Sequence, residues 1–326
     1  GPPRPRPPPH NSHPVMNLRK QKLLLMGKAG AGKTSMRSII FANYVPRDTE
    51  RLGPTLDVEQ SHIRFVGDLA LNLWDCGGQD DLMDNFLDAQ RENVFTSVEV
   101  LLYVFDVESR ENAKDMEYFR LCVESLAHKS PGARVFCLIH KMDLVPEEKR
   151  EAVFSERNTA ITAVSKSLPV ECFPTSIWNE SLYKAWSSVV CSLIPNLGTL
   201  ESRLRRFCDV SEADEVVLFE RATFLVIAHA ALRPHADVHR FEKISNIIKQ
   251  FKLCCNKSRT QLESMEIHQS GLTAVVDAFT KYTCVMVVTS DEAVNPAVTW
   301  INIGKAKNSF DQALEGDGAV GAETSL

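Results

Sequence analysis

Residues 27–34, with the sequence GKAGAGKT, constrain the fold of this 326-residue chain more than any other stretch. They fit the G-x-x-x-x-G-K-[ST] pattern of a phosphate loop, in which glycines let backbone N–H groups wrap around phosphate oxygens. We expect a short buried strand before the loop, at 22–26, and a helix after it, at 33–43. The N-terminus of such a helix attracts anions. This context favours a nucleoside triphosphate site over a glycine-rich turn without a ligand.

The end of the loop adds a positive charge and a metal ligand. Lys33 can reach the β and γ phosphates, and the hydroxyl of Thr34 can bind Mg²⁺. The nucleotide contacts that we expect along this run are Lys28, Ala29, Gly30, Ala31, Gly32, Lys33, Thr34 and Ser35.

Strands and helices alternate through the first two thirds of the chain. Continuous apolar runs at 98–105 and 134–140 are typical of strands that are covered on both faces. The pattern predicts an α/β fold over residues 18–196, with a doubly wound, mostly parallel sheet. The remaining expected elements are strands at 61–66, 69–74 and 170–173, a hairpin turn at Gly67-Asp68, and helices at 111–128 and 181–193.

The last third predicts a smaller α+β domain over residues 197–313. We expect an antiparallel sheet with helices packed on it. A stripe in the helix at 238–251 (Val238, Phe241, Ile244, Ile248, Phe251) is either domain core or a dimer face. The proline-rich start, 1–17, and the end, 314–326, are expected to be disordered. The expected elements are helices at 197–208, 238–251 and 302–313, and strands at 215–220, 223–229, 264–268, 272–278 and 283–289.

A second motif, Asp75-Cys76-Gly77-Gly78-Gln79, follows the strand at 69–74. It resembles the D-x-x-G-Q segment of Ras-like GTPases. Asp75 would hold Mg²⁺ through water, the amide of Gly78 would contact the γ-phosphate, and Gln79 would orient the attacking water as the catalytic residue. Phosphoryl transfer needs positioning more than a strong base, so a neutral amide suffices.

Two threonines lie between these motifs, in the segment 43–61. Ras-like proteins carry a threonine here that closes on Mg²⁺ and the γ-phosphate in the triphosphate state, and Thr55 is the better match. Thr49 could lie near the ribose or the phosphates. Either residue could instead be an ordinary loop hydroxyl.

A third motif, His140-Lys141-Met142-Asp143, ends the strand at 134–140 and resembles the N-K-x-D segment that recognises guanine. A carboxylate at Asp143 can accept hydrogen bonds from both donors of the guanine edge, and adenine offers no such pair. Lys141 would cover the base with its stem. His140 stands where most families have asparagine, and Ile177 would pack near the base through its backbone.

Other classes fit these motifs less well. A nucleotide kinase needs an arginine-rich lid and an adenine-type base site, and Asp143 argues against one. A nucleotide-binding scaffold of low turnover stays open, although Gln79 favours hydrolysis. Arg47, Arg51 and Arg91 are more readily solvated loop charges than catalytic arginines in cis, so intrinsic hydrolysis is expected to be slow.

Composition indicates a protein of the cytosol. The net charge of -5 gives no support to nucleic-acid binding, and none of the nine cysteines falls in a repeated C-x-x-C arrangement. We expect free thiols in a reducing compartment. No stretch has the length of a membrane span and no lipidation signal is evident, so any membrane location would depend on a partner.

Together, runs such as LNLWDCGGQD, CLIHKMDLV and TSIWNESLYKAWSS closely resemble the Rag GTPases of the RagA/RagB (Gtr-type A) branch. The resemblance covers residues 18–312 and includes the histidine of the third motif. It implies a heterodimer with a RagC/RagD-type GTPase, formed through roadblock-like C-terminal domains. It also implies recruitment to the lysosomal surface by the Ragulator scaffold, with the nucleus as an alternative location. The GTP-bound form would signal amino-acid sufficiency by recruiting the TOR kinase complex through its Raptor subunit, and a GATOR-type complex would activate hydrolysis.

Overall fold

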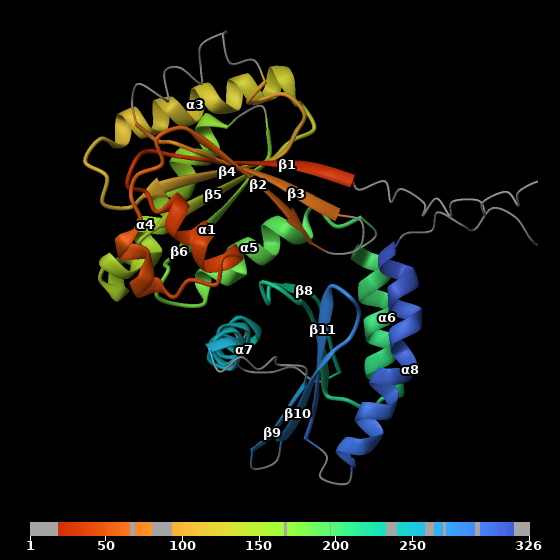
Figure 1. Ribbon diagram of the computed structural model, residues 1–326. Coiled ribbons are helices and arrows are strands. Elements are labelled where there is room, and N and C mark those ends of the chain that lie inside the picture. Colours follow the sequence, from red (N-terminus) through yellow and green to blue (C-terminus); the bar gives the residue numbers. More distant parts are fainter. Residues whose placement is uncertain are drawn as a thin grey trace, which may run out of the picture.

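The computed structural model describes residues 19–65, 69–79, 93–165, 168–195, 197–232, 240–257, 264–269, 272–290 and 294–315. Two sheets, one above the other in Figure 1, organise these residues into an N-terminal and a C-terminal domain. The expected turn at Gly67-Asp68, the chain end at 1–17 and residues 316–326 lie outside the described part of the chain.

The N-terminal domain is built on a six-stranded sheet in the order β2-β3-β1-β4-β5-β6. Strands β4 and β5 and the second half of β1 are largely apolar, and Leu23, Leu24 and Leu25 of β1 are fully buried because helices cover both faces. Only β2 runs antiparallel to its neighbour, as the predicted hairpin requires. The strands are β1 (Arg19–Met26), β2 (Val58–Arg64), β3 (Leu69–Cys76), β4 (Val98–Asp106), β5 (Arg134–His140) and β6 (Val170–Thr175).

Among the described residues, two helices lie on each face of this sheet. Helices α1 (Lys33–Phe41) and α5 (Ser181–Cys191) contribute Met36, Ile39 and Trp186 to one apolar cluster. Helices α3 (Asn112–Lys129) and α4 (Glu147–Val164) contribute Phe119 and Ile161 to the cluster on the other face. The predicted α/β fold, with its doubly wound and mostly parallel sheet, is confirmed.

Sequence patterning missed helix α4. Ile161 is its only fully buried residue, and the helix is otherwise rich in charged and polar side chains. A helix that presents so narrow an apolar stripe has little hydrophobic periodicity to detect. A short 3₁₀ helix, η1 (Pro46–Arg51), was likewise not expected.

The C-terminal domain has a five-stranded antiparallel sheet in the order β8-β7-β11-β10-β9. Helix α7 (Arg240–Lys257) lies on one face, and α6 (Leu197–Val210) and α8 (Pro296–Glu315) lie on the other (Figure 1). Successive residues of β7 alternate between the faces: Val216 and Leu218 join the cluster of α6 and α8, whereas Val217 and Phe219 join Ile248 of α7. The strands are β7 (Glu215–Glu220), β8 (Val226–Ala231), β9 (Ser264–Gln269), β10 (Leu272–Ala278) and β11 (Thr283–Thr289).

Two boundaries in this domain differ from the prediction for local reasons. Strand β8 starts at Val226 rather than 223, because the Glu220 carboxylate accepts hydrogen bonds from Ala222 N (2.9 Å) and Thr223 N (2.7 Å) and holds a turn there. Helix α8 starts at Pro296 rather than 302, because the Asn295 side chain accepts from Ala297 N at 2.9 Å and caps the helix.

The described part of the stripe on α7 is core at Ile244 and Ile248 and exposed at Phe251. Ile248 is fully buried and Ile244 packs against the same cluster, whereas Phe251 is 47% exposed. Val238 and the side chain of Phe241 lie outside the described residues.

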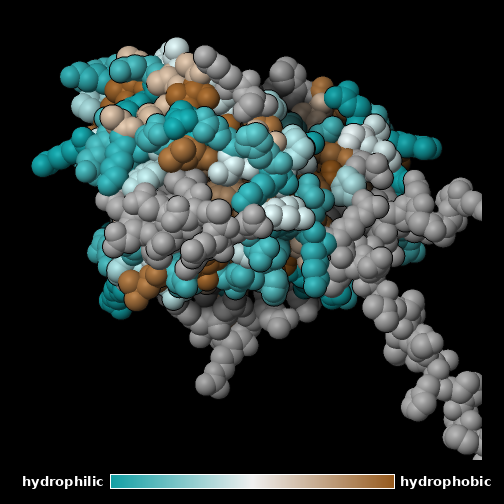
Figure 2. Space-filling view, turned by 90° about the horizontal axis from the view of Figure 1, so that it is seen from above, coloured by the Kyte–Doolittle hydropathy of each residue, from teal (hydrophilic) through white to brown (hydrophobic). Residues whose placement is uncertain are grey.

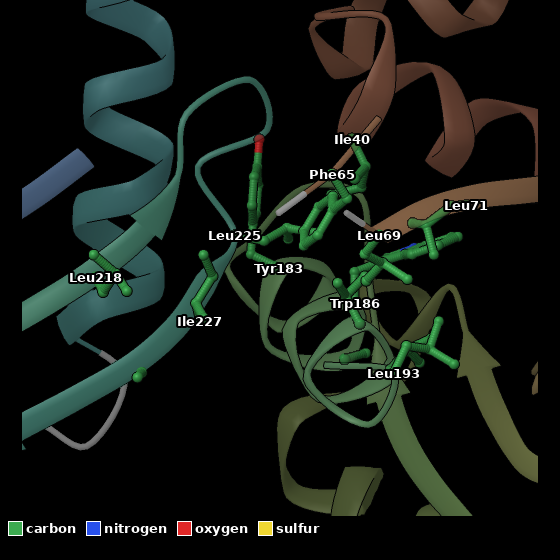
Figure 3. Packing of buried hydrophobic residues seen from close by; sticks show 14 of the residues in the cluster. Ile40, Phe65, Leu69, Leu71, Tyr183, Trp186, Leu193, Leu218, Leu225 and Ile227 are labelled. Atoms are coloured by element: carbon green, nitrogen blue, oxygen red, sulfur yellow. The ribbon is translucent and has the colours of Figure 1, made fainter. Parts of the chain in front are cut away.

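The two domains share one continuous apolar cluster, shown in Figure 3. In this cluster Tyr183 of α5 lies beside Leu225 of the C-terminal domain, and Trp186 of α5 lies beside Leu69 of the N-terminal domain. Ser187 Oγ also accepts a hydrogen bond from Val226 N at 3.0 Å. Helix α5 therefore joins the two domains along its buried face.

Seen from above, the described surface of the N-terminal domain is mainly hydrophilic, with apolar residues scattered among polar ones (Figure 2). None of the helices in the described part of the chain has the length and hydrophobicity of a membrane span. All nine cysteines are free thiols, as expected.

Candidate nucleotide-binding site

The phosphate loop connects β1 to α1 and depends on its glycines. Gly27, Gly30 and Gly32 have φ angles of 134°, 79° and 94°, which side chains rarely tolerate. A Cβ atom at Gly27 would lie 2.3 Å from Val104 O, so the loop also packs too closely on β4 for any side chain. The loop conformation is therefore fixed by residue type and leaves its amides to line a concave surface.

Lys33 folds back over this loop. Its ammonium donates hydrogen bonds to Gly27 O at 2.6 Å and Lys28 O at 2.9 Å, and the side chain is buried. Burial lowers the pKa of Lys33 to about 8, and the Asp75 carboxylate opposes the shift. The lysine thus remains mainly protonated at neutral pH, positioned beside the loop as a cation for phosphate.

Three oxygen-bearing side chains from different elements meet beside Lys33. Thr34 Oγ1 lies 2.7 Å from Thr55 Oγ1 and donates to Asp75 Oδ2 at 3.1 Å. Asp75 is fully buried, and its Oδ1 atom has no hydrogen-bond partner within the described structure. Hydroxyl and carboxylate oxygens are what Mg²⁺ prefers, and a buried carboxylate oxygen without a partner fits a hydrated cation. The described residues contain no group of three or more His, Cys, Asp or Glu side chains that could hold a metal.

Sequence reasoning missed Arg37, one turn after Thr34 on α1. Its Nε lies 3.0 Å from Asp75 Oδ2, and its Nη2 lies 2.7 Å from Glu59 at the start of β2. Burial raises the pKa of Asp75, and Arg37 is the largest influence that lowers it. The i, i+3 spacing from Thr34 was the available signal, because it places both side chains on one helix face.

Gly78 and Gln79 close the cavity from the side of β3. Gly78 O accepts from Ala29 N at 2.8 Å, and a Cβ atom at Gly78 would lie 2.3 Å from Lys28 C. Gln79 Nε2 donates to Thr55 O at 3.0 Å, and its Oε1 atom is buried without a partner in the described structure. Residues 80–92, which include Arg91, lie outside the described part.

These motifs surround a cavity of about 240 Å³. Thr49 does not lie on it: its hydroxyl donates to Pro46 O at 2.7 Å within η1. Lys28 and Ala31, which were expected to contact the nucleotide, are also not among the residues that line this cavity. The lining consists of Ala29, Gly30, Gly32, Lys33, Thr34, Ser35, Leu52, Gly53, Pro54, Thr55, Gly78 and Gln79.

The third motif lies at the ends of β5 and β6, on the same edge of the sheet as the loop. Lys141 has a left-handed φ of 64°, and its Nζ pairs with Asp106 Oδ2 at 2.5 Å. Asp143 Oδ1 accepts a hydrogen bond from Ser176 Oγ at 2.5 Å. The side chain of Ser176 was not predicted to contribute to the site. Ile177 was predicted to pack near the base through its backbone, and it is partly buried against the apolar cluster.

His140 lies directly against the phosphate loop. Its Nδ1 is 3.0 Å from Thr175 Oγ1, and a Cβ atom at Gly32 would lie 2.9 Å from its Cδ2. Burial lowers the pKa of His140 to about 4, with a further contribution from Lys141. The imidazole is therefore neutral at physiological pH, and it links the loop to the base-recognition segment through packing.

A phosphate loop, a D-x-x-G-Q segment and a base-recognition segment on one edge of a doubly wound sheet define a P-loop G protein. Comparisons with known proteins agree. The Gtr1/RagA G protein conserved region matches residues 22–248. The chain is 56% identical over 295 residues to Ras-related GTP-binding protein A of Dictyostelium discoideum, covering 90% of this chain and 98% of that protein.

Two further relatives widen the comparison. Ras-related GTP-binding protein B of Rattus norvegicus is 53% identical over 327 residues, covering 92% of this chain and 87% of that protein. Ras-related GTP-binding protein C of Mus musculus is 28% identical over 214 residues, covering 64% of this chain and 53% of that protein. The chain belongs to the Gtr1/RagA family of G proteins and is a small regulatory GTPase.

Proposed function

We propose that the chain binds GTP with Mg²⁺ in the cavity between the phosphate loop and Thr55, and hydrolyses it slowly with Gln79 as the water-orienting residue. The observation that carries the proposal is the convergence of Thr34, Thr55 and Asp75 within hydrogen-bond distance. Three segments that are distant in sequence meet at one point, which suits a site that reads the γ-phosphate.

The triphosphate would be held mainly by the loop amides and Lys33. The Lys33 ammonium now donates to Gly27 O and Lys28 O, and phosphate oxygens would compete as stronger, charged acceptors. Thr34 and Thr55 would ligate Mg²⁺ and Asp75 would hold it through water. When bound, the cation neutralises charge on the β and γ phosphates.

Hydrolysis would rest on the position of Gln79. Its amide nitrogen is anchored by the Thr55 carbonyl, which leaves the Oε1 atom to accept a hydrogen bond from the attacking water. The catalytic glutamine and Thr55 are thus held together, so ordering of Thr55 by the nucleotide also orders Gln79. No arginine of the described residues lines the cavity, which supports slow intrinsic turnover and an activating partner of the GATOR type.

Guanine selectivity would come from Asp143. Ser176 fixes the carboxylate by donating to Oδ1, and an ionised carboxylate can accept further hydrogen bonds from the guanine edge. Lys141, held by Asp106, would lie along the base, and His140 would support the loop side of the nucleoside.

The C-terminal domain supports a role as one subunit of a Rag-type heterodimer. One edge of its sheet, β8, is covered by α5 through Ser187 and Cys191. The other edge, β9, carries Ile267 at 37% exposure, and Ile247 and Phe251 of α7 are 63% and 47% exposed. A strand edge with an exposed apolar residue suits pairing with a second sheet, here that of a RagC/RagD-type GTPase with a roadblock-like domain. The exposed apolar residues of α7 offer a further surface to such a partner.

In this proposal the heterodimer is held at the lysosomal surface by a Ragulator-type scaffold. Its GTP-bound form recruits the TOR kinase complex through Raptor when amino acids are sufficient. The similarity to Ras-related GTP-binding proteins A and B supports this role. A scaffold that binds nucleotide with almost no turnover is the second candidate.

Nucleotide competition tests the proposal. Purified protein should bind GTP and GDP at least 100-fold more tightly than ATP, and Asp143→Asn should move the preference to xanthosine nucleotides. Asp106→Asn, which removes the partner of Lys141, is the matched control and should keep guanine selectivity. A protein that binds ATP as well as GTP, or a variant with unchanged preference, would remove the guanine assignment.

A further inference from the structure

A second buried lysine, Lys249, lies in the C-terminal domain. Its side chain is only 1% exposed, although it sits on α7 among residues that are partly open to solvent. Removing a cation from water is costly unless polar groups compensate it. The partners of Lys249 therefore indicate what this position does.

Those partners belong to the other domain. Lys249 Nζ donates hydrogen bonds to Ile39 O and, at 3.1 Å, to Ile40 O, about 210 residues away in sequence. Both carbonyls lie in the last turn of α1, where a helix has carbonyls without intrahelical partners and a partial negative charge. The ring of Tyr183, from α5, lies 5.4 Å from the ammonium. Lys249 thus acts as a C-terminal cap on α1, supplied from outside the N-terminal domain.

Helix α1 connects this cap to the nucleotide site. Its first residues are Lys33 and Thr34, and the chain leaves its end through Asn43 and Tyr44 towards Thr55. Tyr44 N and Ala42 N both donate to Ser38 O, so the exit from the helix is itself closely packed. The cap therefore lies where the segment 43–61, which carries Thr55, begins.

The charged neighbours of Lys249 belong to its own domain. Burial and, next, the Lys252 cation lower the pKa of Lys249 to about 7, and Glu220 opposes both. Lys252, three residues on, is a useful contrast, because it donates to Arg221 O (3.0 Å) and Ala222 O (3.4 Å) within its own domain. Both lysines lie on α7 and donate hydrogen bonds to backbone carbonyls. The carbonyls that Lys249 contacts belong to the N-terminal domain, and those that Lys252 contacts belong to the C-terminal domain.

We propose that Lys249 is a positioning residue that couples α7 to the end of α1, so that the C-terminal domain restrains the start of the segment 43–61 and slows the release of nucleotide. Ile247 lies two residues before Lys249, and a helix turns about 200° over two residues, so it faces the opposite way and is exposed. A partner that covers Ile247 would act on the same rigid helix. The inference rests on the proposal that GTP and GDP bind at the phosphate loop.

The test compares Lys249→Met with Lys252→Met in the full-length chain, purified with its partner GTPase where it needs one. Methionine keeps the length of the side chain and removes the donor. Release of a fluorescent GDP analogue in excess Mg²⁺ should be about five-fold faster in Lys249→Met and less than two-fold faster in Lys252→Met. Equal release rates in the two variants would overturn the proposal.

A second measurement needs no variant. Hydrogen exchange of the wild type should show amides at 39–45 and 244–252 changing protection together when GDP is replaced by a non-hydrolysable GTP analogue. Protection in α7 that ignores the nucleotide would also overturn the proposal. If the wild type bound neither nucleotide, the proposed function itself would fail, so the two failures are distinguishable.

Discussion

A buried lysine lies at each end of helix α1, and the two lysines donate to carbonyls in different parts of the molecule. At the N-terminal end Lys33 donates to Gly27 O and Lys28 O, only five or six residues away in sequence. At the C-terminal end Lys249 donates to Ile39 O and Ile40 O from another domain. Burial lowers the pKa of the first to about 8 and of the second to about 7.

The comparison distinguishes a lysine that can bind the nucleotide from a lysine that can only restrain helix α1. Lys33 lies on the cavity and can exchange its carbonyl partners for phosphate oxygens. Lys249 has no access to a ligand and can act only through the helix. The same interaction thus serves as part of a binding site at one end and as a structural restraint at the other.

The largest effect should follow from Lys33→Met. The variant loses two charge-assisted contacts to phosphate, about 4 kcal/mol together, which corresponds to about 1,000-fold weaker GTP binding. Fluorescence titration with a GTP analogue measures this loss, and Lys249→Met should lower affinity by only about five-fold. Similar losses in both variants would abolish the distinction between the two ends of α1.

The next largest effect is a dependence of folding stability on pH, caused by His140, which packs against Gly32. His140 has a folded pKa of about 4, below the ordinary value of 6.5, so the unfolded chain binds its proton more readily between these values. The neutral, buried imidazole therefore contributes fully to the free energy of unfolding above pH 6.5. This contribution is lost as the pH falls to about 4, and the loss is up to about 3 kcal/mol in all. Urea unfolding at stepped pH should show a steeper acid loss in the wild type than in His140→Asn. Parallel curves would mean that His140 is not buried in its neutral form.

A smaller effect is expected at the guanine end. Ser176→Ala removes the donor to Asp143 Oδ1 and should weaken GTP and GDP binding equally, by about ten-fold, since one hydrogen bond to a charged group is lost. Isothermal titration with both nucleotides checks the expectation. A loss confined to GTP would place Ser176 in the γ-phosphate response instead.

Local motifs made the N-terminal end of α1 predictable, since the loop, Lys33 and Thr34 follow one another in sequence. The i, i+3 spacing on α1 could have placed Arg37 beside Thr34. The contacts of Ser176 and Lys249 depend on how distant segments pack, and a single sequence holds no periodic signal for that. Thr49 failed to reach the cavity because its hydroxyl satisfies the short helix η1 instead. Helix α4 was missed because it buries so little.

The central claim, that this is a GTPase whose glutamine is positioned by Thr55, is tested most directly by single-turnover hydrolysis of bound GTP. The wild type should show slow but measurable release of phosphate, and Gln79→Leu should be at least about ten-fold slower with unchanged GTP affinity. Equal rates in the two proteins, or no hydrolysis by the wild type, would contradict the account.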